Sequence, residues 1–254
     1  MRKIVVVKIG TNTLTRERGG LNLGVMQEVA EQIKELQERD FEVILVSSGA
    51  VGSGMRSIGI EKYPTSIELK QLCAAAGQAE LMRTWQMVFG NTKTSQHLLT
   101  HATFDHKKNS KDFKNCLLLA LEKGIVPIVN ENDAISTEEI DEHFTDNDEL
   151  AIMVAGAVSA KRVIILSDIS GLYDANPKEN PNAKLIKEVR KINEKILTLA
   201  SGKSSKGRGG MEGKLKAIAR AMEQNIEVFL TYGGSIDAIL NTFEKDFRGT
   251  IFKK

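Results

Sequence analysis

The sequence has few cysteines, prolines and aromatic residues, and these shortages narrow the class of protein. The 254 residues include two cysteines, four prolines and one tryptophan. Two cysteines cannot form the disulfide framework of a small secreted domain, so we expect Cys73 and Cys116 to be buried, reduced thiols of a cytoplasmic protein. No proline-rich linker divides the chain, and we therefore expect a single domain over residues 1–254.

Long apolar runs and an excess of one charge are also missing. The 35 Lys and Arg residues nearly balance the 33 Asp and Glu residues, which gives a formal net charge of +2. No bulk electrostatic field favours nucleic acid or an anionic membrane as a partner. The longest weakly polar stretch, Ala151–Ala160, is about half the length of a bilayer span, and the apolar segment after Met1 is too short for a signal peptide. We therefore expect no nucleic-acid or membrane partner.

Short apolar runs alternate with longer helical patterns along the chain. Five near-continuous apolar runs are typical of strands in a parallel sheet that is covered on both faces. They span residues 4–9, 42–46, 125–129, 162–166 and 227–230. Helices are expected at 26–36 (with Asn22 as N-cap), 66–88, 111–122, 148–159 and 211–224, and short strands, some of them antiparallel, around 134–144. The alternation predicts an α/β fold, a three-layer α/β/α sandwich with a mainly parallel central sheet.

Two common nucleotide-binding motifs do not occur in the sequence. The P-loop requires G-x-x-x-x-G-K-[ST], but the Gly-Lys pair at 213–214 has Arg208 and Leu215 at the flanking motif positions. The dinucleotide fingerprint requires G-x-G-x-x-G after the first strand, whereas Gly52-Ser53-Gly54 follows the second strand and ends at Ser57. The histidines form no HExxH pattern, so we predict no protein-bound metal site.

Polar and small residues gather where the expected strands end. The carboxyl ends of parallel strands meet at one edge of the sheet, where open α/β sheets bind ligands. The residues at these ends are Lys8, Gly10, Ser48, Gly49, Asn130, Asp133, Ser167 and Asp168. The triplet 146–148 opens a helix, and the Gly/Ser/Lys-rich stretch 201–213 leads to Lys214. By composition alone, that stretch fits a solvated linker and an anion-binding loop equally well.

Lys8 is the most informative single residue because it interrupts an apolar strand. A buried lysine is costly without a carboxylate or phosphate partner. The alternative is an edge strand from which the side chain reaches solvent. Asp148 also fits two interpretations, a site carboxylate or a helix N-terminal residue favoured by the helix dipole.

Together these motifs resemble the amino acid kinase superfamily and, within it, the glutamate 5-kinase family. The segments that carry the resemblance are VVVKIGTNTLT, VSSGAVGSG, IVPIVNENDAIST, DNDELA, LSDISGLYDANP and GRGGMEGKL, and they cover essentially the whole chain. NEND followed by DND favours glutamate 5-kinase over aspartokinase, N-acetylglutamate kinase, carbamate kinase and UMP kinase. Ser167 stands where threonine is common, and Glu212-Gly213 replaces a small hydroxylated pair, which leaves the phosphate contacts of that loop open.

The resemblance implies ATP-dependent phosphorylation of the L-glutamate γ-carboxylate to L-glutamyl 5-phosphate, the first step of proline biosynthesis, with Mg²⁺ on the ATP. The implied catalytic residues are Lys8, Lys214 and Asp148. The implied substrate-binding residues are Ser48, Gly49, Asn130, Asp133, Asp146 and Asn147. The implied ATP-binding residues are Lys8, Gly10, Ser167, Asp168, Gly171, Tyr173, Asp174, Arg208, Gly209, Gly210, Met211, Glu212, Gly213 and Lys214.

The resemblance also implies partners and an assembly. It implies L-glutamate as substrate, proline as feedback inhibitor, and a cytoplasmic homo-oligomer, either a dimer or a tetramer. Many family members carry a C-terminal PUA domain, whereas here the kinase pattern finishes close to Lys254, so we expect a single amino acid kinase domain without it. A different class stays open, a non-catalytic regulator that binds nucleotide or nucleic acid.

Overall fold

The computed structural model describes residues 2–254 except 17–18, 101, 136–146, 178 and 201–209. Its strands join in one eight-stranded sheet with the order β3-β4-β2-β1-β5-β7-β8-β6. The strands are β1 (Ile4–Ile9), β2 (Glu42–Ser47), β3 (Thr94–Leu99), β4 (Val126–Glu131), β5 (Arg162–Ser167), β6 (Glu188–Val189), β7 (Glu227–Tyr232) and β8 (Thr250–Phe252). Neighbouring strands of this sheet are parallel except β7 and β8. The mainly parallel sheet is therefore confirmed.

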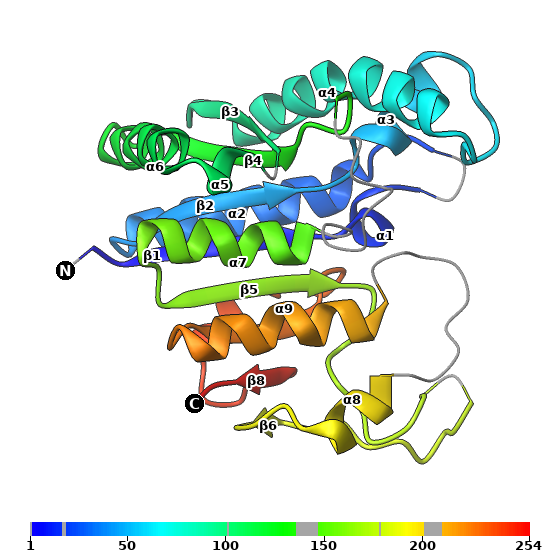
Figure 1. Ribbon diagram of the computed structural model, residues 1–254, viewed down its shortest axis with the longest axis vertical. Coiled ribbons are helices and arrows are strands. Elements are labelled where there is room, and N and C mark those ends of the chain that lie inside the picture. The colour runs from blue at the N-terminus through cyan, green and yellow to red at the C-terminus, as the bar shows by residue number, and fades with distance from the viewer. Residues whose placement is uncertain (1, 17–18, 101, 136–146, 178, 201–209) are drawn as a thin grey trace.

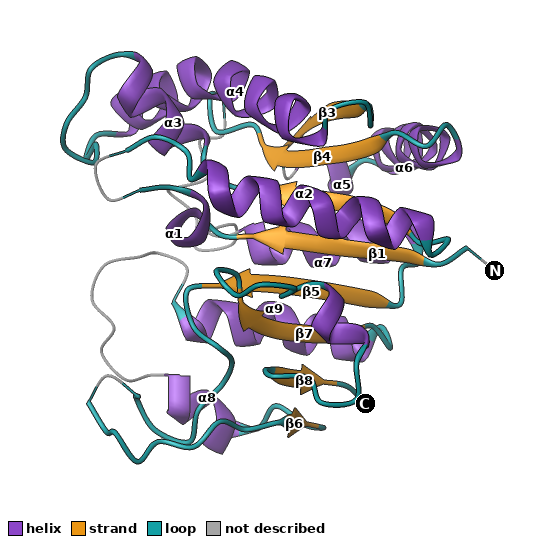
Figure 2. Cartoon of the chain, turned by 180° about the vertical axis from the view of Figure 1, so that it is seen from behind, coloured by secondary structure: helices purple, strands orange, loops and turns teal. Residues whose placement is uncertain are grey.

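Helices cover both faces of the sheet and complete the predicted sandwich. The long helices are α2 (Leu23–Glu38), α4 (Ile67–Phe89), α6 (Lys107–Glu122), α7 (Asn147–Val158) and α9 (Met211–Glu223). The short ones are α1 (Thr11–Leu14), α3 (Ala50–Ser57), α5 (Ala102–Asp105), α8 (Glu194–Ala200) and the 3₁₀ helix η1 (Leu240–Phe243). Figure 1 shows α7 and α9 in front of the sheet, and Figure 2 shows α2 and α4 on the opposite face. Within the described part of the chain, no helix has the length and apolarity needed to cross a bilayer.

The central strands are buried on both faces, which explains their continuous apolar runs. Along β1, Ile4 and Val6 pack into the core beneath α6, α7 and α9, while Val5 and Val7 pack into the core beneath α2 and α4. This is the alternation expected of a strand, since successive side chains point to opposite faces. Neither face of β1 is left for polar residues, so Lys8 is placed in the interior.

Contact between α3 and α4 fixes the loop that follows β2. A Cβ on Gly54 would lie 1.7 Å from the carbonyl oxygen of Cys73, and a Cβ on Gly77 would lie 2.0 Å from that of Ala50. The two backbones therefore touch where neither helix has a side chain. Gly49, with φ of 105°, turns the chain from β2 into α3, and this positive φ favours glycine.

Several details of the sequence-based expectations are wrong or incomplete. The edge strand β3 and the glycine-containing helix α3 were not predicted. Cys116 is exposed, because Phe113 and Leu117 occupy the buried face of α6. Asn22 is the N-cap of α2, but its side chain makes no capping hydrogen bond. The strands expected around 134–144 fall almost entirely outside the described residues.

Candidate active site

A buried carboxylate, Asp148, lies between two buried lysines. Lys8 belongs to β1, Asp148 to the first turn of α7, and Lys214 to the beginning of α9. The Nζ of Lys8 is 2.7 Å from Oδ1 of Asp148, and the Nζ of Lys214 donates a hydrogen bond to Oδ2. The side chains of Lys8 and Lys214 are 4% and 9% exposed. Because β1 is a central strand between β2 and β5, the edge-strand interpretation of Lys8 is excluded.

The cluster combines two positive charges with one negative charge. Burial alone would raise the pKa of the Asp148 carboxyl, but the adjacent ammonium groups of Lys8 and Lys214 outweigh burial and hold that pKa well below its ordinary value. Asp148 is therefore ionised at neutral pH and fixes both lysines. The excess of positive charge in a buried position suits the binding of an anion.

Two backbone features beside the lysines suit such an anion. Gly10 follows β1, and a Cβ at this position would lie 3.4 Å from the Nζ of Lys8, so glycine keeps access to the ammonium group open. Helix α9 begins at Met211 with Gly210 as its N-cap, and the unpaired N–H groups of a helix N-terminus bind phosphate groups. The site thus has fixed cations and backbone donors in one place.

Side-chain hydrogen bonds join the ends of β1 and β5, on the β5 side of β1. Asn12 donates its Nδ2 hydrogen to Oδ2 of Asp168 at 3.2 Å, and Ser167 donates its hydroxyl to Oδ1 at 3.2 Å. Asn12 was missed by sequence reasoning, although it lies in the VVVKIGTNTLT segment. Ser167 and Asp168 were predicted, and they lie at the carboxyl end of β5 beside the cluster.

A chain of side-chain hydrogen bonds occupies the other side of the cluster. Asn147 donates through Nδ2 to Oγ of Ser48 at 2.7 Å and to Oδ1 of Asn130 at 2.9 Å. Asn130 donates through Nδ2 to Oε1 of Gln78, a residue of α4, at 3.1 Å. Because Asn147 directly precedes Asp148 in α7, this chain is attached to the lysine cluster. Sequence reasoning missed Gln78, which lies in an Ala-rich stretch that resembles ordinary helix core.

A pocket of about 260 Å³ adjoins the hydrogen-bonded chain, slightly below the usual size of ligand pockets. It is lined by Ala74, Ala75, Gln78, Ala79, Gln96, Leu98, Glu131, Asn132, Asp133 and Ala134. The pocket lies between α4 and the carboxyl ends of β3 and β4. It places the predicted substrate residue Asp133 next to Gln78, which the hydrogen bonds connect to Asn130 and Ser48.

Several predicted ATP-binding residues have clear local packing roles. Gly171, with φ of 153°, is buried against β8, where a Cβ would lie 2.6 Å from Oγ1 of Thr250. Tyr173 forms an isolated bridge with Leu185, and Oδ1 of Asp174 accepts from the N–H of Lys184. Met211, Glu212 and Gly213 form the first turn of α9. Asp146, Arg208 and Gly209 lie outside the described residues.

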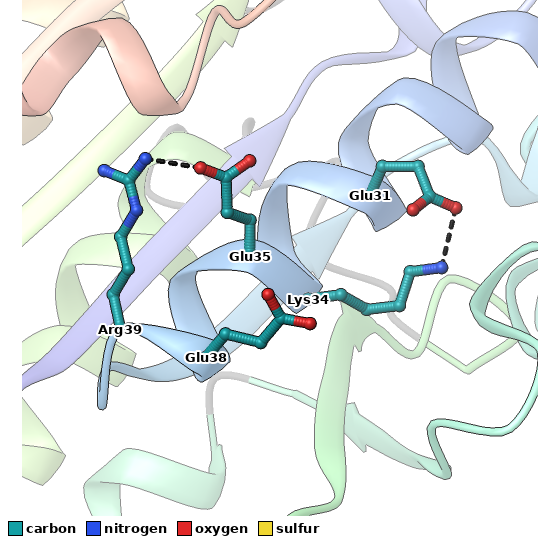
Figure 3. Close-up of a pocket in the computed structure, with 5 residues that line it drawn as sticks. All are labelled: Glu31, Lys34, Glu35, Glu38 and Arg39. Carbon is teal, nitrogen blue, oxygen red and sulfur yellow. Dashed lines mark hydrogen bonds and ion pairs between the residues drawn. The ribbon is translucent and has the colours of Figure 1, made fainter.

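A second hollow lies on the outer side of α2 and is lined entirely by charged side chains (Figure 3). Lys34 pairs with Glu31 at 2.6 Å, and Arg39 pairs with Glu35. These are neighbours on one exposed helix face, where such pairs contribute little to stability. We assign this hollow no binding role.

Comparison with known proteins agrees with the fold. Residues 3–232 match the model of the amino acid kinase family. A glutamate 5-kinase of Oenococcus oeni is 39% identical over 98% of this chain and 95% of its own length, and one of Clostridium acetobutylicum is 40% identical over 98% and 93%. A crystal structure of UMP kinase from Ureaplasma parvum superposes with a TM-score of 0.68 at 18% identity and covers both chains fully. The chain therefore belongs to the amino acid kinase family, as a kinase of the glutamate 5-kinase group.

Proposed function

We propose that the protein transfers the γ-phosphoryl group of ATP to the γ-carboxylate of L-glutamate, producing L-glutamyl 5-phosphate and ADP, the first step of proline biosynthesis. The observation that carries this proposal is the buried cluster of Lys8, Asp148 and Lys214. On one side of the cluster lie the joined ends of β1 and β5. On the other side lies the chain of hydrogen bonds through Asn147, Asn130 and Gln78, which we call the amide chain. The phosphoryl donor and the phosphoryl acceptor therefore have separate sides. The full-length similarity to glutamate 5-kinases supports glutamate as the acceptor.

The chemistry requires no catalytic base. A glutamate side chain has a pKa of about 4.3, so the attacking carboxylate is already ionised at neutral pH. One of its oxygens forms a bond to the γ-phosphorus while the bond from phosphorus to the bridging β,γ-oxygen breaks, and ADP leaves with that electron pair. The obstacle is repulsion between two anions, and fixed cations reduce it and stabilise the charge of the transferring group.

The lysines meet this requirement from two directions. Lys8 approaches from the sheet and Lys214 from α9, and Asp148 keeps their ammonium groups on either side of one carboxylate. We place the ATP phosphates against Gly10, the N-terminus of α9 and the end of β5, and glutamate against Ser48, Asn130, Asp133 and Asn147. The γ-phosphorus then lies at the lysine cluster, between the two sides.

Magnesium enters this proposal as part of the MgATP substrate. Among the residues that the structure describes, no three His, Cys, Asp or Glu side chains are grouped to hold a metal ion. Both oxygens of Asp148 face lysines rather than a free position. Mg²⁺ usually keeps several waters and binds phosphate oxygens with few protein ligands, which fits this residue set.

The family also supports further proposals about regulation and assembly. We expect proline to act as a feedback inhibitor of a cytoplasmic homo-oligomer, either a dimer or a tetramer. The single sheet formed by the described strands supports one catalytic domain. A proline titration of the reaction rate and sedimentation of the purified protein test the first two expectations.

A substrate panel tests the proposed function directly. The purified protein is given MgATP with glutamate, aspartate, N-acetylglutamate, carbamate or UMP, and ADP release is followed. We expect turnover with glutamate at least tenfold faster than with the others, and turnover about 100- to 1,000-fold slower in the Lys214→Met variant. ADP release that is as fast or faster with another member of the panel, or tight ATP binding without transfer to any of them, would contradict the proposal.

A further inference from the structure

We propose that Gln78 of α4 determines specificity for the acceptor amino acid, because its amide sets the direction of the hydrogen bonds that reach Ser48 and supplies a donor for the α-carboxylate of glutamate. The inference rests on the proposed function. Gln78 lies between the pocket of about 260 Å³ and the amide chain, and it belongs to both.

The direction of the chain follows from counting donors and acceptors. A primary amide has one nitrogen with two hydrogens and one accepting oxygen. Asn147 uses both hydrogens of its Nδ2, one toward Ser48 and one toward Asn130. The Oδ1 of Asn147 is then the atom of this amide that can accept a hydrogen bond. The hydroxyl of Ser48 accepts a hydrogen bond from Asn147 and can still donate its own hydrogen.

The two directions place different atoms of the Gln78 amide next to Asn130. Neighbouring amides can reverse only together, because each oxygen must face a nitrogen. In the reversed chain, Nε2 of Gln78 would face Asn130, and the hydroxyl of Ser48 would be consumed by Asn147. With Oε1 of Gln78 turned toward Asn130, the chain ends instead on a hydroxyl that can donate to substrate.

The nitrogen of Gln78 supplies the second part of the inference. Its Nε2 is buried and has no hydrogen-bond partner in the described structure. Buried polar groups without partners are rare and costly, so such an atom calls for an explanation. A carboxylate oxygen of a ligand in the adjoining pocket would complete its hydrogen bonding.

Glutamate has the complementary groups. Its γ-carboxylate must face the γ-phosphorus at Lys8 and Lys214, which leaves the α-carboxylate and the α-ammonium group to be recognised elsewhere. The donors Nε2 of Gln78 and the Ser48 hydroxyl suit the α-carboxylate, and the acceptor Oδ1 of Asn147 suits the ammonium group. A site that hydrogen-bonds its substrate in this way rejects analogues without the matching group.

The test compares Gln78→Met and Gln78→Glu with a matched control, Gln86→Met. Gln86 lies on the same helix, but its amide bonds to backbone groups of Gly90, Thr92 and Thr94, away from the site. We expect Gln78→Met to raise the KM for glutamate about tenfold or more, with the KM for ATP changed little. The Tm should fall modestly, because Nδ2 of the buried Asn130 loses its acceptor. Gln86→Met should lower the Tm and leave the KM for glutamate within twofold of the wild-type value.

Two further measurements separate specificity from structural support. L-Isoglutamine carries a carboxamide in place of the α-carboxylate, and that group can donate to an anionic side chain. We expect Gln78→Glu to lower the ratio of kcat/KM for glutamate over isoglutamine at least tenfold. In the double variant with Ser48→Ala, the effect of Gln78→Met should be smaller than in the wild-type background, because the two residues act through one chain.

The outcomes can be told apart. If the wild-type protein phosphorylates glutamate but Gln78→Met keeps its KM for glutamate within twofold, or Gln78→Glu keeps the wild-type substrate ratio, the inference is wrong and the proposed function stands. Fully multiplicative effects of Gln78→Met and Ser48→Ala would also overturn it. If the wild-type protein does not phosphorylate glutamate, the proposed function itself fails, which is known before any variant is measured.

Discussion

Lys8 and Lys214 contact the two oxygens of the same carboxylate, that of Asp148, from opposite ends of the chain. Each ammonium group is thereby held in position before any substrate arrives. A preorganised charge stabilises a transition state without reorganising during the reaction. The arrangement therefore predicts separate roles for the carboxylate, which positions, and for the lysines, which act on phosphate.

Replacing either lysine should reduce catalysis strongly and leave the fold intact. In Lys8→Met and Lys214→Met, Asp148 keeps one ionic partner, so the buried carboxylate is still neutralised. Loss of one charge-stabilising donor should lower kcat about 100- to 1,000-fold. Steady-state kinetics with circular dichroism as a folding control tests this, and a kcat within tenfold of wild type would remove that lysine from the mechanism.

Asp148→Asn should affect stability more than any lysine variant. The change leaves two buried ammonium groups without their shared carboxylate, and breaking a buried ion pair in this way costs about 3–5 kcal/mol. Urea unfolding measures the loss. Glu31→Gln, which removes an exposed pair with Lys34 on α2, is the matched control and should change the free energy of unfolding by less than about 1 kcal/mol.

The lowered pKa of Asp148 predicts how this stability depends on pH. A carboxyl group whose pKa is lower in the folded state stabilises the protein fully above the ordinary carboxyl pKa of about 3.9. That contribution is lost as the pH falls through the folded-state value. The difference in Tm between wild type and Asp148→Asn should therefore stay constant from about pH 5 to 8 and shrink below about pH 4. A difference that already shrinks at pH 6 would contradict the assignment.

Variants of the substrate side should weaken glutamate binding selectively. Asn147→Ala removes the amide that joins Ser48 to Asn130, and Asp133→Ala removes a carboxylate from the pocket wall. We expect the KM for glutamate to rise about tenfold or more in each, with the KM for ATP nearly unchanged. Unchanged KM values for glutamate would separate these residues from the substrate.

The contact between α3 and α4 predicts a position-dependent effect of glycine replacement. Gly77→Ala would place a Cβ 2.0 Å from the carbonyl oxygen of Ala50 and 2.3 Å from the backbone nitrogen of Gly54. Because both of these atoms belong to the backbone, we expect the free energy of unfolding to fall by about 2 kcal/mol or more. Gly24→Ala in α2 meets only Oδ1 of Asn22 at 3.7 Å, an ordinary contact. It should stabilise the protein slightly, since alanine favours helix over glycine. Equal effects in thermal unfolding would refute this account.

The sequence predicted the central strands because their burial on both faces leaves an unmistakable apolar pattern. Strand β3 was missed because it lies at the edge of the sheet, and its residues Thr94–Leu99 are mostly polar or only partly buried. Helix α3 was missed because Gly52 and Gly54 suggest a loop. Only the close approach of α4, a tertiary contact, explains why glycine is tolerated there.

Some residues of the candidate site were predictable from the sequence and others were not. Lys8 was conspicuous because a charge interrupted an apolar strand, and the ordered motifs associated it with Asp148 and Lys214. Gln78 and Asn12 gave no such signal, since a glutamine in an Ala-rich helix and an asparagine after a strand are common. Their relevance depends on which side chains the fold brings next to them, and local pattern does not contain that information.

The position of α9 has a consequence for how the protein is made. When the ribosome has released the chain through α7, the chain already contains Lys8 and Asp148, together with every member of the amide chain from Gln78 to Ser48. The second ammonium group is synthesised much later, after β5 and the segment that leads to α9. The proposed phosphoryl-transfer centre is therefore completed late in translation, and a chain released before Lys214 would contain the residues proposed to hold the acceptor but lack one of the two lysines.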